Sequence, residues 1–133
     1  MTQWKIIADD GWHKLTMKIS SKKSVSIIIR SYNEEDSISH CLNSVFSQDY
    51  NNFEVIVVDN CSNDKTIDIV KTYPIKKIVY IENYIPGGSI NLGIESSTGD
   101  IIVLLSAHCV PKYNNWLTTL VDNFNQDNIA GVY

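Results

Sequence analysis

The sequence predicts an α/β fold in which a mostly parallel sheet is flanked by helices. Short, nearly continuous apolar runs rich in valine and isoleucine recur along the chain, which is typical of strands buried on both faces of a parallel sheet. Segments with helical spacing of apolar residues separate these runs, and such alternation indicates right-handed βαβ units. Three of the runs also end in polar residues, at the edge where open α/β sheets form their ligand crevice.

Four strands are expected, at residues 25–29, 53–58, 78–81 and 101–105, and a further strand is expected to begin at Ile129. The second run stops at Asp59, and the fourth, the most hydrophobic, runs into Ser106-Ala107-His108. Each of these strands is short, as buried parallel strands usually are.

Four helices are expected between the strands, at residues 38–46, 66–73, 89–96 and 116–124. Pro74 ends the second helix, because proline cannot continue it. Pro86-Gly87-Gly88 is expected to form a loop before the third helix. In that helix Ile90, Leu92 and Ile94 are expected to be partly buried.

Length and composition bound the class of protein. A chain of 133 residues fits one domain, and its net charge of -4 gives no support to nucleic-acid binding. Residues 1–23 show strand alternation around Asp9-Asp10-Gly11, which predicts an N-terminal β-hairpin before a domain at 24–133. Three widely spaced cysteines and the lack of a long apolar run favour a reduced, cytoplasmic setting, with peripheral contact at the inner face of a membrane as an alternative.

Three groups of polar residues are expected to converge at the carboxyl edge of the sheet. They are the loop at 30–34, Asp59 with its turn, and residues 106–109. Tyr32 would offer an aromatic wall, and the Asp59 carboxylate could accept hydrogen bonds from a base or a ribose. The alternative for Asp59 is that it caps its own turn through Ser62.

A cysteine nucleophile is not expected at this edge. Cys109 and His108 are adjacent, and neighbouring residues of an extended segment point to opposite faces, so they do not form a Cys–His pair.

Several segments of residues 25–111, with Trp116 beyond them, resemble in order the donor-binding half of family-two glycosyltransferases. These enzymes share the nucleotide-sugar-binding GT-A fold, a Rossmann-like arrangement. No single segment is specific, but together they are. The segments are Ser26-Ile27-Ile28-Ile29-Arg30-Ser31-Tyr32-Asn33-Glu34-Glu35, Cys41-Leu42-Asn43-Ser44-Val45, Gln48, Phe53-Glu54-Val55-Ile56-Val57-Val58-Asp59-Asn60, Ser62, Thr66, Asn91-Leu92-Gly93-Ile94, Thr98-Gly99-Asp100, the strand into Ser106, and Trp116.

The resemblance implies that the ligand is a UDP- or dTDP-sugar donor. It implies that Asp59 binds the base and that Asn91 and Gly93 follow the pyrophosphate region, although this chain has Ile90 where the family often has arginine. The donor-binding residues predicted on these grounds are Ser31, Tyr32, Glu34, Asp59, Asn91, Ser106 and His108.

The metal site of the resembled family is altered in this chain. The family ends the last of these strands in Asp-x-Asp, whose second aspartate holds magnesium or manganese, and this chain has Ser106-Ala107-His108. His108 could act as a metal ligand, better for manganese than for magnesium. It could instead donate directly to a diphosphate oxygen, or simply hydrogen-bond at the strand end with no ligand.

The function implied by the resemblance is glycosyl transfer from the nucleotide sugar to an acceptor, in polysaccharide or glycoconjugate synthesis. An inverting transfer needs a carboxylate base, which the family places in the second half of its domain, so the chain alone is expected to be incomplete for catalysis and no catalytic residue is assigned. The alternative is a non-catalytic, degenerate module that binds a ligand or self-associates, as a homo-oligomer formed through a sheet edge. A receiver-like phosphoacceptor domain is disfavoured, because Arg30-Ser31-Tyr32 stands where such domains carry acids.

Overall fold

The structure, a computed structural model, describes residues 22–83, 85–126 and 128–132 and confirms the expected α/β fold. Within these residues a parallel four-stranded sheet has the strand order β3-β2-β1-β4. The hairpin expected at 1–23 lies almost entirely outside the described part of the chain. In chain order the elements are β1 (Val25–Ser31), α1 (Ile38–Phe46), β2 (Phe53–Asp59), α2 (Thr66–Val70), β3 (Lys77–Tyr80), α3 (Pro86–Glu95), β4 (Ile101–Ser106) and α4 (Trp116–Asn123).

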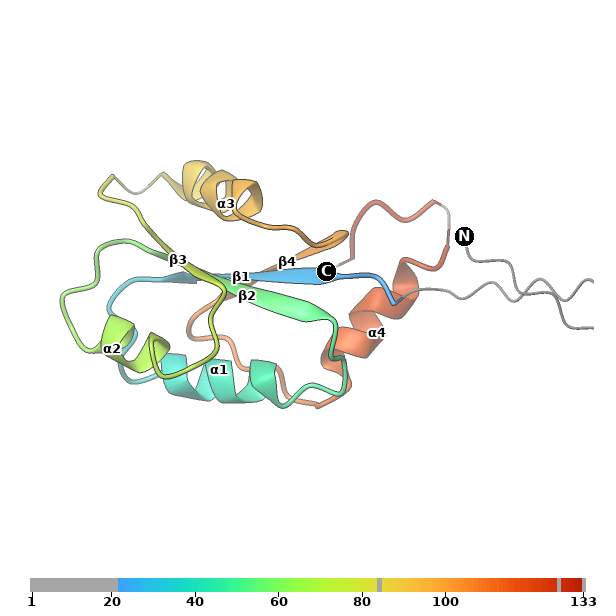
Figure 1. The fold of residues 1–133 in the computed structure, drawn as a ribbon, viewed down its shortest axis with the longest axis horizontal. Coiled ribbons are helices and arrows are strands. Elements are labelled where there is room, and N and C mark those ends of the chain that lie inside the picture. Colours follow the sequence, from blue (N-terminus) through green and yellow to red (C-terminus); the bar gives the residue numbers. More distant parts are fainter. Residues whose placement is uncertain (1–21, 84, 127, 133) are drawn as a thin grey trace, which may run out of the picture.

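The helices form a layer on each side of the sheet. Helices α1, α2 and α4 lie on one side, and α3 lies on the other (Figure 1). The larger core joins Ile27 and Ile29 of β1 to Leu42 of α1 and Leu117 of α4, all of them fully buried. The smaller core, on the α3 side, is built around Ile28, Ile56 and Val58.

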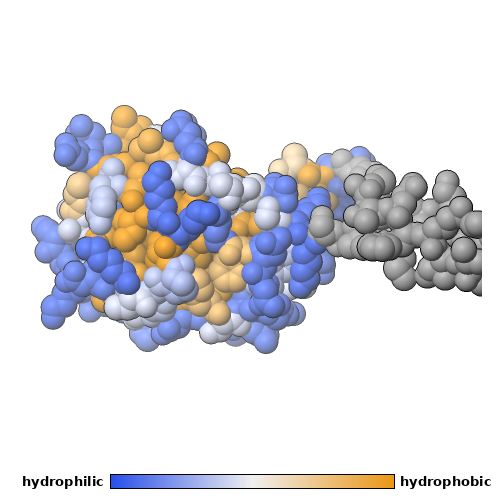
Figure 2. All heavy atoms as spheres, in the orientation of Figure 1, coloured by the Kyte–Doolittle hydropathy of each residue, from blue (hydrophilic) through white to orange (hydrophobic). Residues whose placement is uncertain are grey.

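Side-chain alternation assigns each strand residue to one of these two sides. Ile28 pairs in register with Ile56 of β2 and Leu104 of β4, so these three side chains share the α3 side. Because both sides of β1 and β2 are covered, their sequences are almost continuously apolar, as expected for central parallel strands. Figure 2, drawn in the orientation of Figure 1, shows hydrophobic residues in the middle of the molecular surface turned toward the viewer and hydrophilic residues around them.

Helix α3 differs from its prediction in two respects. It begins at Pro86, so Pro86-Gly87-Gly88 forms its first turn rather than a loop, which the missing N–H of proline permits at that position. Leu92 and Ile94, expected to be partly buried, are 39% and 42% exposed, and Ser89 and Gly93 face the sheet instead. Only small residues fit there, because a Cβ on Gly93 would lie 2.5 Å from Cγ2 of Ile28.

Two further differences from the expectation exceed the shifts of one or two residues at the ends of other elements. Helix α2 ends at Val70, three residues before the predicted end at residue 73, and a turn carries the chain on to β3. The prediction of a strand from Ile129 is wrong for the residues described there, because residues 128–132 are in no strand. Among the described residues, no helix combines the length and the apolar character needed to cross a membrane.

Candidate functional site

A cavity of about 370 Å³ opens at the carboxyl edge of the sheet, and we call it the edge cavity. Its volume lies in the range of small-molecule sites, roughly 300–1,000 Å³. The segments that follow β1, β2, β3 and β4 contribute to its walls, as does α3. The lining residues are Arg30, Ser31, Tyr32, Glu34, Val58, Asn60, Ile81, Ser89, Ser106 and His108.

The edge cavity lies on the α3 side of the sheet. Arg30 follows Ile28 by two residues and therefore shares its side, and its register partner on β4 is Ser106. On β2 the same alternation puts Val58 on this side. The cavity is thus formed between the strand ends and the first turn of α3, where Ser89 lies.

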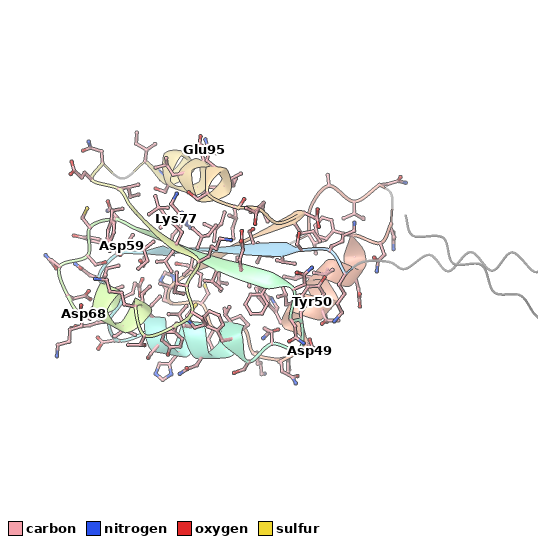
Figure 3. The ribbon with its side chains drawn as sticks, in the orientation of Figure 1. Asp49, Tyr50, Asp59, Asp68, Lys77 and Glu95 are labelled. Atoms are coloured by element: carbon pink, nitrogen blue, oxygen red, sulfur yellow. The ribbon has the colours of Figure 1, made fainter. Side chains whose placement is uncertain are left out.

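Asp59 lies at the same edge but is fully buried. It is not among the described residues that line the edge cavity, and Figure 3 shows it at the opposite end of the sheet from Asp49 and Tyr50. The hydroxyl of Ser31 donates to its Oδ1 at 2.7 Å. Ser62 donates twice, from its hydroxyl to Oδ1 at 2.6 Å and from its backbone N–H to Oδ2 at 2.8 Å. Both carboxylate oxygens therefore have protein partners, including the Ser62 turn named as the alternative for this residue.

The loop after β1 is tied to the loop after β2 by hydrogen bonds. The backbone N–H of Asn33 donates to Oγ of Ser62 at 2.9 Å, and the N–H of Glu34 donates to Oγ1 of Thr66 at 2.7 Å. Asn33 and Cys61 both have φ near 51°, in the left-handed region that few non-glycine residues adopt. These contacts hold two walls of the edge cavity in a fixed relation.

Glu34 and His108 are hydrogen-bonded to each other in the lining of the edge cavity. Nδ1 of His108 lies 2.8 Å from Oε1 of Glu34, and the hydroxyl of Ser37 donates to Oε2 of Glu34 at 2.5 Å. Burial raises the pKa of the Glu34 carboxyl, but hydrogen bonds from His108 and Ser37 and the positive charge of His108 outweigh it, so the net shift of the pKa is downward. Glu34 is therefore an ionised acceptor at neutral pH.

The residues after β4 do not match the ligand set of a protein-held divalent ion. The side chain of Ala107 has no ligand atom, and both carboxylate oxygens of Glu34 already accept hydrogen bonds. The described residues contain no cluster of three or more histidine, cysteine, aspartate or glutamate side chains that could hold a metal. Magnesium and manganese favour several oxygen ligands, and this donor set does not supply them.

The structure brings together five of the seven predicted donor-binding residues. Ser31, Tyr32, Glu34, Ser106 and His108 all line the edge cavity. Asp59 is buried behind it, and Asn91 is an exposed residue of α3 that is not among the lining residues.

Other lining residues were missed by the sequence analysis. Ser89 of α3 was not expected at the site, and Arg30 and Asn60, which lie in segments expected to converge there, were not among the predicted donor-binding residues. Strand alternation places Val58 and Asn60 on one side of the sheet. The sequence shows neither the register that pairs Arg30 with Val58 nor which side of the sheet holds the cavity.

The fold and the edge cavity define an α/β protein with a cavity at the carboxyl ends of parallel strands. Residues 26–133 match the profile of the family described as glycosyl transferase family 2. The chain belongs to this family. The expected GT-A fold is confirmed by its solved relatives.

Two curated relatives illustrate the sequence similarity. The chain is 36% identical over 96 residues to a dolichyl N-acetyl-alpha-D-glucosaminyl phosphate 3-beta-D-2,3-diacetamido-2,3-dideoxy-beta-D-glucuronosyltransferase of Methanococcus voltae, covering 66% of this chain and 30% of that protein. It is 38% identical over 100 residues to glycosyltransferase AglE of Haloferax volcanii, covering 70% of this chain and 33% of the relative. The chain thus spans about a third of the length of these relatives.

Two solved structures share the fold. The mannosyltransferase PcManGT of Pyrobaculum calidifontis, in complex with GDP-Man and Mn²⁺, matches with a TM-score of 0.74 and 25% identity over 83% of this chain and 34% of that one. Residues 1–349 of S. aureus TarS, in complex with UDP-GlcNAc, match with a TM-score of 0.69 and 27% identity, covering 83% of this chain and 37% of TarS 1–349.

Proposed function

We propose that this chain binds the nucleotide-sugar donor of a glycosyltransferase, and that the protein to which it contributes transfers the sugar in polysaccharide or glycoconjugate synthesis. The observation that carries the proposal is the edge cavity, where residues from four strand ends meet at the position expected for a ligand in an open α/β sheet. Relatives that bind GDP-Man and UDP-GlcNAc support the class of ligand.

The lining suits the parts of a nucleoside diphosphate. Tyr32 is 55% exposed and can stack on a base, while Asn60 can both donate to and accept from a base edge. Arg30 and His108 are basic groups suited to a diphosphate. Direct contact of Asp59 with the base stays a prediction, and its present hydrogen bonds favour a role in holding the loop that presents Asn60.

The donor is proposed to be a UDP- or dTDP-sugar, and calorimetric titration of the chain with UDP, dTDP and GDP tests this. We expect UDP or dTDP to bind more tightly than GDP. If no nucleoside diphosphate binds the folded chain at millimolar concentration, the proposed donor-binding function is wrong.

The same titration tests the metal requirement. The ligand set after β4 favours UDP binding that is similar in Mn²⁺ and in EDTA, with His108 meeting the diphosphate directly. Binding that depends on Mn²⁺ would instead support His108 as a metal ligand.

A second candidate function is self-association. Strand β4 is an edge strand of the described sheet, and its Leu104 is 49% exposed on the α3 side. Exposed apolar edge strands pair readily with other chains. Light scattering over a concentration series tests this candidate: a dimer at micromolar concentration supports it, and a monomer throughout contradicts it.

A further inference from the structure

We propose that Glu34 is a positioning residue that holds the His108 ring, so that Nε2 of His108 is the ring nitrogen that contacts the nucleotide-sugar donor. This inference rests on the proposed donor-binding function and assigns Glu34 a role different from direct contact with the nucleotide. It starts from the 2.8 Å contact between Nδ1 of His108 and Oε1 of Glu34, two residues 74 positions apart that both line the edge cavity.

The Glu34 carboxylate is itself held in place. Oε2 of Glu34 accepts a hydrogen bond from the Ser37 hydroxyl at 2.5 Å. The backbone N–H of Glu34 donates to Oγ1 of Thr66 at 2.7 Å. The side chain of Glu34 is 22% exposed, whereas that of His108 is 64% exposed. An exposed imidazole samples several rotamers, and a fixed carboxylate at hydrogen-bond distance selects one of them.

The hydrogen bond also fixes which ring nitrogen carries the proton. An ionised carboxylate only accepts, so Nδ1 of His108 carries the proton shared with Glu34. Nε2 is left for the ligand, and it donates to a diphosphate oxygen when the ring is doubly protonated. Oγ of Ser106 lies 3.3 Å from the same Nδ1, a longer contact than the one to Glu34. The ring therefore has one defined tautomer or, when doubly protonated, one defined orientation.

Electrostatics argue against direct contact between Glu34 and the donor. A carboxylate facing a diphosphate is a repulsive arrangement. Pairing with His108 offsets the charge of Glu34, and both of its carboxylate oxygens already accept hydrogen bonds from protein side chains. Glu34 is better suited to act through His108 than to bind the nucleotide itself.

The first test is the protonation of the His108 ring in the full chain without ligand. Long-range ¹H–¹⁵N spectra report which ring nitrogen carries a proton, and loss of one signal set in His108→Gln assigns it among the three histidines. At alkaline pH, once the ring carries a single proton, we expect that proton on Nδ1 in the parent chain. We expect the same tautomer in Glu34→Gln, which keeps an acceptor oxygen. In Glu34→Ala we expect the tautomer equilibrium of the His108 ring to shift toward Nε2–H.

Asp36→Ala is the matched control, because it removes an exposed acid from the same loop. It should leave the His108 signals unchanged. Identical tautomer populations in the parent chain and in Glu34→Ala would overturn the inference.

The second test is a double-mutant cycle on UDP binding, measured by calorimetry. Loss of a charged hydrogen-bond partner predicts that Glu34→Ala and His108→Ala each weaken UDP binding about tenfold. If Glu34 acts only through His108, the double variant is also weakened about tenfold, since the two effects are not additive. A loss of about a hundredfold would mean that Glu34 contacts UDP independently, and it would overturn the proposal.

The two tests separate this inference from the function on which it rests. If the parent chain binds no nucleoside diphosphate, the proposed function fails, and with it the claim that Nε2 meets a donor. The ligand-free spectra still judge whether Glu34 orients the ring.

Discussion

Ser31 and Asp59 are register partners on adjacent strands, and the Ser31 hydroxyl donates a 2.7 Å hydrogen bond to Oδ1 of Asp59. Asp59 also accepts two hydrogen bonds from Ser62, whose hydroxyl oxygen accepts from the N–H of Asn33. The buried carboxylate thus joins the ends of β1 and β2 and the two loops that leave them. The adjacent residue, Asn60, faces the edge cavity.

This arrangement predicts different effects for changes at Asp59 and Asn60. Asp59→Asn replaces one acceptor oxygen by a donor beside groups that donate to it, so we expect the free energy of unfolding to fall by about 1–3 kcal/mol. We expect Asn60→Ala to change stability by less than about 0.5 kcal/mol but to weaken UDP binding. Urea unfolding and calorimetry measure the two effects. A stable Asp59→Asn variant that has lost UDP binding would instead favour direct contact between Asp59 and the base.

Tyr32 is predicted to contribute to nucleotide affinity. It lines the edge cavity with a 55% exposed ring, and loss of base stacking typically costs about 1–3 kcal/mol. Tyr32→Ala should therefore weaken UDP binding roughly five- to hundredfold. Tyr113→Ala removes a tyrosine that is 63% exposed and is not among the lining residues, and it serves as the control. Equal affinities of both variants for UDP would argue against a stacking role for Tyr32.

Two glycines of α3 should respond in opposite ways to alanine. A Cβ on Gly93 would lie 2.5 Å from Cγ2 of Ile28 and 3.2 Å from Cγ2 of Val58, so Gly93→Ala should destabilise the fold by about 1–3 kcal/mol through overpacking. A Cβ on Gly87 meets nothing within 4 Å, so Gly87→Ala should be neutral or stabilise by up to ~1 kcal/mol. Thermal unfolding measures both variants. Similar melting temperatures for the two would contradict the close packing of α3 on β1.

Glu54 is predicted to make stability depend on acid pH. Burial raises the pKa of its carboxyl, but hydrogen bonds from Ser26, Thr98 and Lys76 outweigh it and lower the pKa from 4.5 to about 2. The charged form is favoured in the folded state, so this stabilisation is present above about pH 4.5 and is lost as the pH falls toward 2.

Glu54→Gln provides the measurement. We expect a loss of about 2 kcal/mol in the free energy of unfolding at pH 7, and a difference that narrows steadily below pH 4.5. Glu95→Gln, at an exposed position of α3, is the control. A constant difference between the parent chain and Glu54→Gln from pH 7 to pH 3 would contradict the assigned pKa.

The sequence predicted the strands well because their burial on both sides leaves a simple pattern. The runs around Ile28, Ile56 and Val103 are apolar and β-branched, and the structure extends each predicted strand by no more than two residues. Helix α3 was harder to predict. Its contact side consists of Ser89 and Gly93, which carry no apolar periodicity, while Leu92 and Ile94 suggested a buried side that is exposed.

The α/β class, the strand ends at which polar residues gather and the family resemblance could all be read from the amino-acid sequence. It could not decide whether Asp59 or Asn60 faces the edge cavity, because alternation along β2 places the two on opposite sides without saying which side is open. The tertiary structure decided this, since α3 packs over Ile28 and Val58 and leaves the edge cavity on its own side of the sheet. Only folding brought Glu34 within 2.8 Å of His108, because a contact between residues 74 positions apart depends on the parallel pairing of β1 with β4.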